Sequence, residues 1–298
     1  MTKVLVTGSA GLIGRQVTHD LIKENFDVYS CYNNEKPEFG IPTYLNLSKS
    51  DGIVTVLYSV KPEIIIHLAA ITDVDLCETQ RDLAYLVNTK ATQVLARESN
   101  KYNSFFVYMS TDYIFDGKNG MKNETDKPNP INFYGKSKLD GELALSDSSS
   151  IIRTSTPFGL HAKKKSFPLW IKENLESKKE IPVLVDQFTS PTFVPNLSKM
   201  LIEVAIKQIR GIIHLTGSTR ISRYEFARLI ADKFSLDSSF LKPSKISEMK
   251  WIAQRPQDSS LNISKAIQIL DNKPQTIENS LENFLNQLKN LNQDYQQS

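Results

Sequence analysis

The sequence predicts an α/β protein with a doubly wound parallel sheet and a smaller C-terminal region. Three observations lead to this prediction. In the first half of the chain, short apolar runs alternate with amphipathic helical patterns, as in βαβ units. Several of these runs are apolar nearly throughout, which is typical of strands covered on both faces. A glycine-rich turn joins the first apolar run to the first helical pattern, the order expected at the start of such a sheet.

The expected strands are runs rich in Val, Ile and Phe, and the expected helices carry apolar residues at helical spacing. Strands are expected at residues 3–6, 27–31, 64–67, 105–109 and 151–153, with helices at residues 12–24, 52–60, 83–99 and 132–145. After residue 155, prolines punctuate shorter segments and the rhythm changes. There we expect helices at residues 167–177, 195–208, 222–234, 264–270 and 276–291, and a strand at residues 211–215 that returns to the main sheet.

The composition excludes several classes of protein. The chain has 298 residues, of which 40% are hydrophobic and 23% charged, as in globular proteins. Its net charge is only +3 and is spread along the chain, which argues against nucleic acid as a partner. No apolar stretch is long enough to span a membrane, and the two cysteines, Cys31 and Cys77, do not form a metal-site pattern. We therefore expect a cytoplasmic protein without a membrane, nucleic-acid or metal partner.

The turn after the first expected strand carries glycines at the spacing G-x-x-G-x-x-G. Gly8 and Gly11 let the turn adopt positive φ and let the backbone approach a pyrophosphate closely. Gly14 lets the following helix pack tightly on its strand, and the N-terminus of that helix offers free N–H groups to phosphates. The turn therefore predicts a Rossmann-type site for a nicotinamide dinucleotide.

The chain is expected to divide into two regions. Residues 1–155 would form the dinucleotide-binding domain, to which residues 195–216 return. Residues 156–194 and 217–298 would form the substrate-binding region. Ligands of open α/β sheets bind beyond the carboxyl ends of the strands, so the two regions are expected to meet there.

The end of the second expected strand leaves the choice of dinucleotide open. An acid at this place commonly holds the adenosine ribose, whereas an arginine attracts the 2′-phosphate of NADP. The sequence here is Tyr32-Asn33-Asn34, which supplies neither charge. We count Asn33 among the expected cofactor contacts and expect either NADPH or NADH.

A set of polar residues supplies the chemistry of ketone reduction. Tyr134 and Lys138 stand four residues apart on an expected helix, so their side chains share one face. Thr111 and Asp112 follow the strand at residues 105–109, at the edge where ligands bind. The Tyr134 phenol would donate a proton to the ketone oxygen, and the Lys138 cation would lower the pKa of that phenol. Thr111 would orient the carbonyl and stabilise the developing alkoxide.

These motifs together resemble the extended short-chain dehydrogenase/reductase family, and more narrowly its dTDP-4-dehydrorhamnose reductases. The resemblance extends over nearly the whole chain. Beside the glycine turn and the Tyr134-x-x-x-Lys138 pair, it is carried by residues 67–75, 110–113, 153–156, 186–192 and 255–262. It implies reduction of the 4-keto group of a nucleotide sugar, dTDP-4-dehydro-L-rhamnose, to dTDP-L-rhamnose.

The resemblance also implies contacts residue by residue. Cofactor contacts fall, with the glycines and the Tyr134–Lys138 pair, on Leu12, Ile13, Asn46, Leu47, Leu68, Ala69 and Ala70. Substrate contacts fall on Thr111, Asp112, Thr156, Gln187 and Arg255. Arg255 would pair with the substrate pyrophosphate, with a structural salt bridge as the alternative. The lysines at residues 163–165 are expected in a solvated loop or helix start, with a phosphate contact as the alternative.

Three positions depart from the pattern of the family. The family usually has an acid where Asn46 stands and often a tryptophan where Thr156 stands, so the adenine site and the sugar pocket are expected to differ. Gln16 stands where some members bind magnesium between subunits through a glutamate, and we predict no metal. A homodimer is the candidate assembly.

Two other functions stay open at this point. One is another nucleotide-sugar reductase or a 4-epimerase of the same superfamily, which the departures at Asn46 and Thr156 allow. The other is a non-catalytic regulatory subunit similar to that of methionine adenosyltransferase, which has the same fold. Such a subunit can keep the tyrosine and lysine, although no catalytic position is lost here.

Overall fold

The computed structural model describes residues 1–161 and 165–297, with side chains up to residue 290. Its centre is a seven-stranded sheet in the order β11-β6-β5-β4-β1-β2-β3, and every neighbouring pair is parallel. This order reverses direction at β1, so the sheet is doubly wound, and the predicted fold class is confirmed. The strands are β1 (Lys3–Thr7), β2 (Asp27–Tyr32), β3 (Ile41–Tyr44), β4 (Ile64–His67), β5 (Phe105–Thr111), β6 (Ser150–Thr154) and β11 (Gly211–His214).

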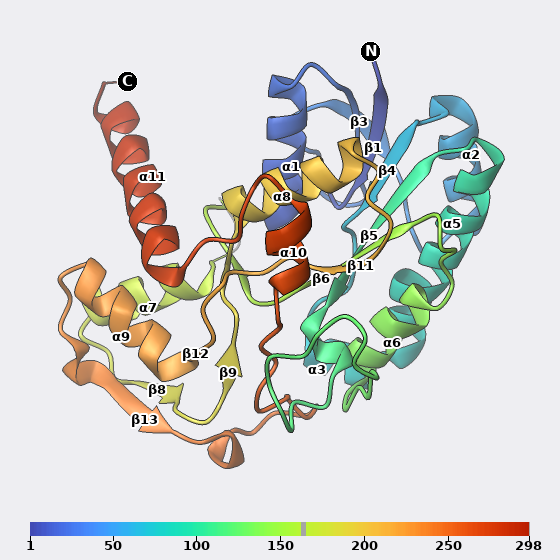
Figure 1. Cartoon of the computed structure of the whole chain (residues 1–298). Coiled ribbons are helices and arrows are strands. Elements are labelled where there is room, and N and C mark those ends of the chain that lie inside the picture. The colour runs from blue at the N-terminus through green and yellow to red at the C-terminus, as the bar shows by residue number, and fades with distance from the viewer. Residues whose placement is uncertain (162–164, 298) are drawn as a thin grey trace.

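Helices cover both faces of the sheet (Figure 1). One face is covered by α1 (Leu12–Lys23), α8 (Val194–Ile206) and α10 (Ser264–Ile269). The other face is covered by α2 (Ser50–Val60), α5 (Ala91–Lys101) and α6 (Phe133–Glu142). The short helices α3 (Val74–Thr79) and α4 (Arg81–Ala84) and the π-helix η1 (Tyr85–Lys90) precede α5. Among the described residues, no helix combines the length and apolar character that a membrane crossing requires.

The C-terminal part of the chain forms a lobe with its own aromatic core. It contains α7 (Phe167–Glu176), α9 (Arg223–Lys233) and α11 (Ile277–Gln297), with the strand pairs β7 (Pro157–Phe158)–β10 (Thr192–Phe193), β9 (Phe188–Thr189)–β12 (Ile221–Ser222) and β8 (Ile181–Leu184)–β13 (Leu241–Ser244). Phe158 is fully buried at its centre, with ring centroids 5.6 Å from Phe226 and 5.9 Å from Phe284. Single 3₁₀ turns lie at η2 (Asp112–Ile114), η3 (Ser238–Phe240) and η4 (Ile246–Glu248).

Most expected elements form close to their expected bounds, and two differences have a physical reason. Strand β3 was not expected, because Pro42 interrupts its apolar pattern. A proline is tolerated there because β3 is the edge strand of the sheet. The helix expected at residues 83–99 is three segments, since the π-helix Tyr85–Lys90 widens one turn in its middle. Strand β11 pairs with β6, and α8 packs on α1. The division at residue 155 stays a prediction.

A buried ion pair ties α6 to the sheet. Arg153 of β6 donates from Nη2 to Glu142 Oε2 at 2.8 Å and from Nε to Oε1 at 3.1 Å. Ser110 of β5 also donates to this carboxylate. Both charged side chains are almost completely buried. The pair therefore holds the end of α6 against two neighbouring strands.

Removing one member of this pair should destabilise the protein strongly. Arg153→Met leaves Glu142 buried without its cation, and we expect a loss of about 3–5 kcal/mol in the free energy of unfolding. Urea denaturation followed by circular dichroism measures this loss. The matched control is Lys136→Met, which removes an exposed i,i+4 pair with Asp140 and should change stability by about 0.5 kcal/mol or less. An Arg153→Met variant as stable as the control would contradict the prediction.

Candidate active site

The glycine turn lies between β1 and α1 in a conformation that excludes larger residues. Gly8 has φ +69°, and a Cβ at this residue would lie 2.9 Å from the Ala69 backbone. A Cβ at Gly14 would lie 2.1 Å from the carbonyl oxygen of Gly8. Gly11 is the N-cap of α1, and no side chain caps that helix end. The turn therefore presents bare backbone and a free helix N-terminus, as a diphosphate requires.

The ends of β1 and β4 are joined by a hydroxyl group. The Thr7 hydroxyl accepts hydrogen bonds from the N–H groups of Leu68 and Ala69, at 3.1 and 3.2 Å, and lies 2.7 Å from Nδ1 of His67. Burial lowers the pKa of His67 to about 3, so this ring is a neutral core residue. The contact brings the segment Leu68-Ala69-Ala70 beside the glycine turn. The family resemblance implies that this segment makes further cofactor contacts.

The expected adenosine contacts lie at the carboxyl ends of β2 and β3. Asn33 is exposed after β2. Asn46 lines a hollow of about 370 Å³ at the end of β3, formed by Tyr44, Leu45, Asn46, Lys49, Ser50, Asp51 and Gly52. The Asn46 side-chain oxygen accepts hydrogen bonds from the N–H and hydroxyl of Ser48, so it stabilises its own turn. Leu47 packs on the core beneath this hollow.

Tyr134 is placed by the N-terminus of α6, close to Thr111 and Asp112. Asn132 caps this helix, and its side chain accepts a hydrogen bond from the N–H of Gly135 at 2.8 Å. The ring centroid of Tyr134 lies 5.9 Å from that of Tyr113. Thr111 lies near the Tyr134 phenol and lowers its pKa, and the Thr111 hydroxyl donates to Asp112 at 3.0 Å. The structure thus brings together three residues that the sequence predicted for the site.

Burial governs the protonation of both catalytic candidates. It raises the pKa of the Tyr134 phenol, while Thr111 lowers it. Burial also lowers the pKa of Lys138 to about 7, with Glu142 opposing the shift. The expected lowering of the phenol pKa by Lys138 is therefore not the net effect here, since burial is the largest cause of the shift and Lys138 is not among its main causes. The Lys138 ammonium lies 4.2 Å from the ring centroid of Tyr108.

Asn88, on the π-helix, positions α6 and the loop after β4. Its side chain accepts a hydrogen bond from the N–H of Ile71 at 2.8 Å and donates to the carbonyl of Ile71 at 3.0 Å. It also donates to the Ser137 hydroxyl at 3.0 Å. Ser137 in turn donates to the carbonyl of Tyr134 at 2.8 Å. The sequence reading missed Asn88, since nothing in its local pattern distinguishes it from an ordinary helical asparagine.

A second polar cluster contains Thr156, Gln187 and one residue that the sequence reading missed, Arg223. The Arg223 guanidinium donates to Thr156 Oγ1 at 3.3 Å and to Gln187 Oε1 at 3.4 Å. Thr156 adopts φ +41°, which is rare for a β-branched residue and typical of functional sites. The structure therefore unites two expected substrate contacts around a cation from α9. A single arginine at a helix start gave no sequence signal, because such residues are usually solvated.

Arg255 is already paired within the protein. Its Nη1 lies 3.2 Å from Asp75 Oδ1 and donates to the carbonyl of Ala253 at 2.9 Å. Its guanidinium also stacks over the ring of Trp251, 5.2 Å from the centroid. Of the two roles that the sequence left open, the structure shows the salt bridge. Of the lysines at 163–165, Lys165 pairs with Glu173 at 2.5 Å, and the first two lie outside the described residues.

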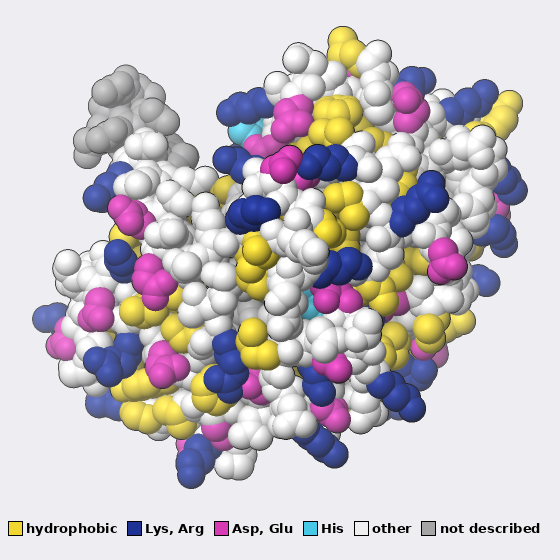
Figure 2. Space-filling model, viewed as in Figure 1, with side chains coloured by type: hydrophobic (Ala, Val, Ile, Leu, Met, Phe, Trp, Pro, Cys, Tyr) yellow, Lys and Arg dark blue, Asp and Glu magenta, His cyan; other side chains and the backbone are white. Residues whose placement is uncertain are grey.

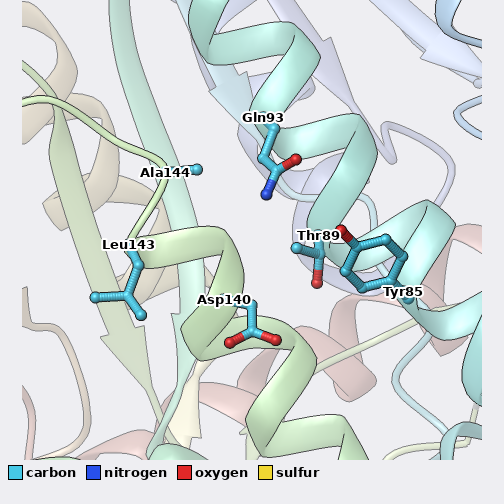
Figure 3. Close-up of a pocket in the computed structure, with 6 residues that line it drawn as sticks. All are labelled: Tyr85, Thr89, Gln93, Asp140, Leu143 and Ala144. Atoms are coloured by element: carbon cyan, nitrogen blue, oxygen red, sulfur yellow. The ribbon is translucent and has the colours of Figure 1, made fainter.

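Other surface features lie apart from this site. A hollow of about 270 Å³ between η1, α5 and α6 is lined by Tyr85, Thr89, Gln93, Asp140, Leu143 and Ala144, none of which belongs to the expected set (Figure 3). On the face in Figure 2, positive and negative side chains are interspersed. Within the described part of the chain, no group of three or more His, Cys, Asp or Glu side chains is arranged to hold a metal ion.

Comparison with known proteins identifies the family. A model described as "RmlD substrate binding domain" matches residues 1–290. The chain belongs to this family. It is 31% identical to a dTDP-4-dehydrorhamnose reductase of Aggregatibacter actinomycetemcomitans, covering 95% of this chain and 98% of that one. It is 32% identical to methionine adenosyltransferase 2 subunit beta of Rattus norvegicus, covering 88% and 81%.

A solved structure matches the fold of this chain closely. The crystal structure of dTDP-4-dehydrorhamnose reductase from Bacillus anthracis in complex with NADP has a TM-score of 0.87 and 30% identity. The match covers 96% of this chain and all of that one. The glycine turn of the present chain fits a dinucleotide, because its backbone cradle would be filled by a Cβ at Gly8 or Gly14. The resemblance proposed from the motifs is confirmed.

Filling this cradle should weaken dinucleotide binding strongly. Gly14→Ala places a methyl group against the Gly8 carbonyl, so the turn must open. We expect the affinity for NADPH to fall more than about 30-fold, which corresponds to about 2 kcal/mol. Titration of NADPH fluorescence measures this affinity.

The control is Gly211→Ala at the start of β11, at the end of the sheet opposite the site, where a Cβ would meet nothing within 4 Å. Its φ of +86° makes alanine strained there, so this variant is expected to lose some stability but no cofactor contact. This variant should bind NADPH like the unmodified protein. Equal binding by the two variants would show that the close approach at Gly14 does not shape the site.

Proposed function

We propose that this protein is an NAD(P)H-dependent reductase that converts the 4-keto group of dTDP-4-dehydro-L-rhamnose to the alcohol of dTDP-L-rhamnose. The observation that carries the proposal is the cluster of Thr111, Tyr134 and Lys138 at the carboxyl end of β5. It lies in the same sheet as the glycine cradle, two strands from β1. The similarity to dTDP-4-dehydrorhamnose reductases along nearly the whole chain supports the same substrate.

The proposed reaction assigns one task to each side chain. When bound, the nicotinamide supplies a hydride to the carbonyl carbon. The Tyr134 phenol, held protonated by burial at neutral pH, donates its proton to the carbonyl oxygen. The Thr111 hydroxyl, which donates to Asp112 in this structure, turns to the developing alkoxide and stabilises it. Lys138 in its cationic form offsets the negative charge that forms on the phenol.

Glycine residues 8, 11 and 14 with Leu12 and Ile13 hold the diphosphate, and the C-terminal lobe holds the substrate. The cofactor is NADPH or NADH, since Asn33 has no charge that selects between them. We place the protein in the cytoplasm, because both described cysteines are buried and unpaired. A homodimer is the proposed assembly.

A second candidate function is a regulatory subunit. It is favoured by the 32% identity to methionine adenosyltransferase 2 subunit beta. The reductase is preferred because Thr111, Tyr134 and Lys138 are all present and Thr111 lies near the Tyr134 phenol. Purified protein that binds NADPH but never oxidises it with the keto sugar would favour the regulatory role. Turnover of a nucleotide sugar without added reductant would favour a 4-epimerase.

Tyr134→Phe should remove the proton donor and little else. The phenyl ring keeps the packing on Tyr113, so the fold and NADPH binding should persist. We expect the rate of keto-sugar reduction to fall about 100-fold or more, the usual contribution of general acid catalysis. Loss of absorbance at the nicotinamide band measures this rate. Tyr113→Phe is the control, and a Tyr134→Phe variant with the full rate would refute the assignment of the acid.

The pH dependence should report Lys138. Its pKa is lowered to about 7, so the cation is half present near pH 7, nearly complete about one pH unit below and mostly lost about one pH unit above. Because the cation assists proton transfer from the phenol, kcat/KM for reduction should decline above about pH 7. Lys138→Arg, which stays charged, should move this decline to higher pH. A profile that is unchanged in the arginine variant would contradict this role.

A further inference from the structure

Arg223 is the first residue of α9, and its guanidinium contacts Thr156 and Gln187, two of the expected substrate contacts. Ser222 and Glu225 form a reciprocal capping box that fixes this end of the helix. The N–H of Arg223 donates to the carbonyl of Gln187 at 2.9 Å, which ties the helix start to the loop before β9. The guanidinium also stacks on Phe167, 5.3 Å from the ring centroid. Its position is therefore fixed by the backbone and by an aromatic face.

The charge of Arg223 has no carboxylate partner among the described residues. Its two side-chain acceptors, Thr156 and Gln187, are neutral. Two neighbouring cations differ in this respect, because Arg255 pairs with Asp75 and Arg220 pairs with Asp258 at 2.6 Å. Burial lowers the pKa of Arg223, an effect that nearby Asp112 and Tyr113 oppose. A half-buried cation with neutral neighbours is well suited to an anionic ligand.

A chain of hydroxyl groups connects Arg223 to the catalytic cluster. Thr156 Oγ1 lies 2.5 Å from Thr189 Oγ1, which lies 2.7 Å from Ser155 Oγ. Ser155 donates to Asp112 Oδ2 at 2.7 Å, and Thr111 donates to the other carboxylate oxygen. Arg223 therefore stands at one end of a continuous polar path that leads to Thr111. Both Arg223 and Arg255 also lower the pKa of Tyr113, so the two cations face the same site.

We propose that Arg223 binds a phosphate group of the substrate's nucleoside diphosphate, a role that the sequence predicted for Arg255. The proposal rests on the proposed function, because it takes the substrate to be a nucleotide sugar. A guanidinium offers a planar fork that matches phosphate oxygens, and neutral partners are displaced without leaving a buried acid unpaired. Arg255 would have to give up its salt bridge with Asp75 to do the same.

The test compares two ligands that differ in one group, thymidine diphosphate and thymidine. Isothermal titration calorimetry of the full chain measures both affinities, with NADPH binding as a separate readout. Arg223→Met should weaken thymidine diphosphate about 10- to 100-fold, as for the loss of charge-assisted hydrogen bonds. Thymidine and NADPH should bind as in the unmodified protein. Arg228→Met is the control, since Arg228 is exposed on the same helix.

The outcomes separate this inference from the proposed function. If Arg223→Met binds thymidine diphosphate like the unmodified protein, the inference fails and the reductase proposal stands. If the unmodified protein binds NADPH but neither thymidine nor its diphosphate, the substrate of the proposed function is wrong and the inference falls with it. Arg223→Lys guards against a folding defect in the methionine variant. It keeps the charge without the fork, so it should lose less affinity for the diphosphate than methionine does.

Discussion

The close packing of α6 against β5 and the η2 turn that follows it is the constraint on which the site depends. A Cβ at Gly135 would lie 2.1 Å from the Tyr113 carbonyl oxygen, and a Cβ at Gly141 would lie 2.4 Å from the Tyr108 hydroxyl. Both glycines let the helix approach more closely than any other residue would allow. The contact carries the phenol of Tyr134 to the end of β5 and buries Lys138 over an aromatic ring. Without this approach the two side chains would share a helix face but lie in water.

The same packing sets the electrostatics of the site. Glu142 is on α6, one turn after Lys138, and it opposes the lowering of the lysine pKa by burial. Its carboxylate is occupied by Arg153 and Ser110, so the acid anchors the helix and supplies negative charge behind the lysine. A buried ion pair of this kind adds little net stability compared with apolar packing, because both charges lose their hydration. Its value here is that it fixes the position of α6 relative to two strands.

The sequence predicted the parts of the site that depend on local spacing, and it missed those that depend on tertiary contacts. The glycine turn and the Tyr134–Lys138 pair are readable because a strand–turn–helix and an i,i+4 face are short-range patterns. Arg223 was not found, because its neighbours lie 67 and 36 residues away and meet it only in the folded chain. The pKa directions were also beyond the sequence, since burial decides them. Strand β3 was also not predicted, because its assignment depends on tertiary structure. Pro42 is acceptable in a strand only because β3 lies at the edge of the sheet.

The hydroxyl path between Arg223 and Asp112 is built from neutral side chains. Ser155, Thr156 and Thr189 can each donate or accept, so the path can reverse its hydrogen bonds when a ligand changes the charge at one end. A path of carboxylates and ammonium groups would be fixed in one direction, and each charge would lose more hydration on burial. Thr156 at φ +41° keeps its hydroxyl within this path at the cost of backbone strain. A tryptophan at this position could not complete the path, because its indole group only donates.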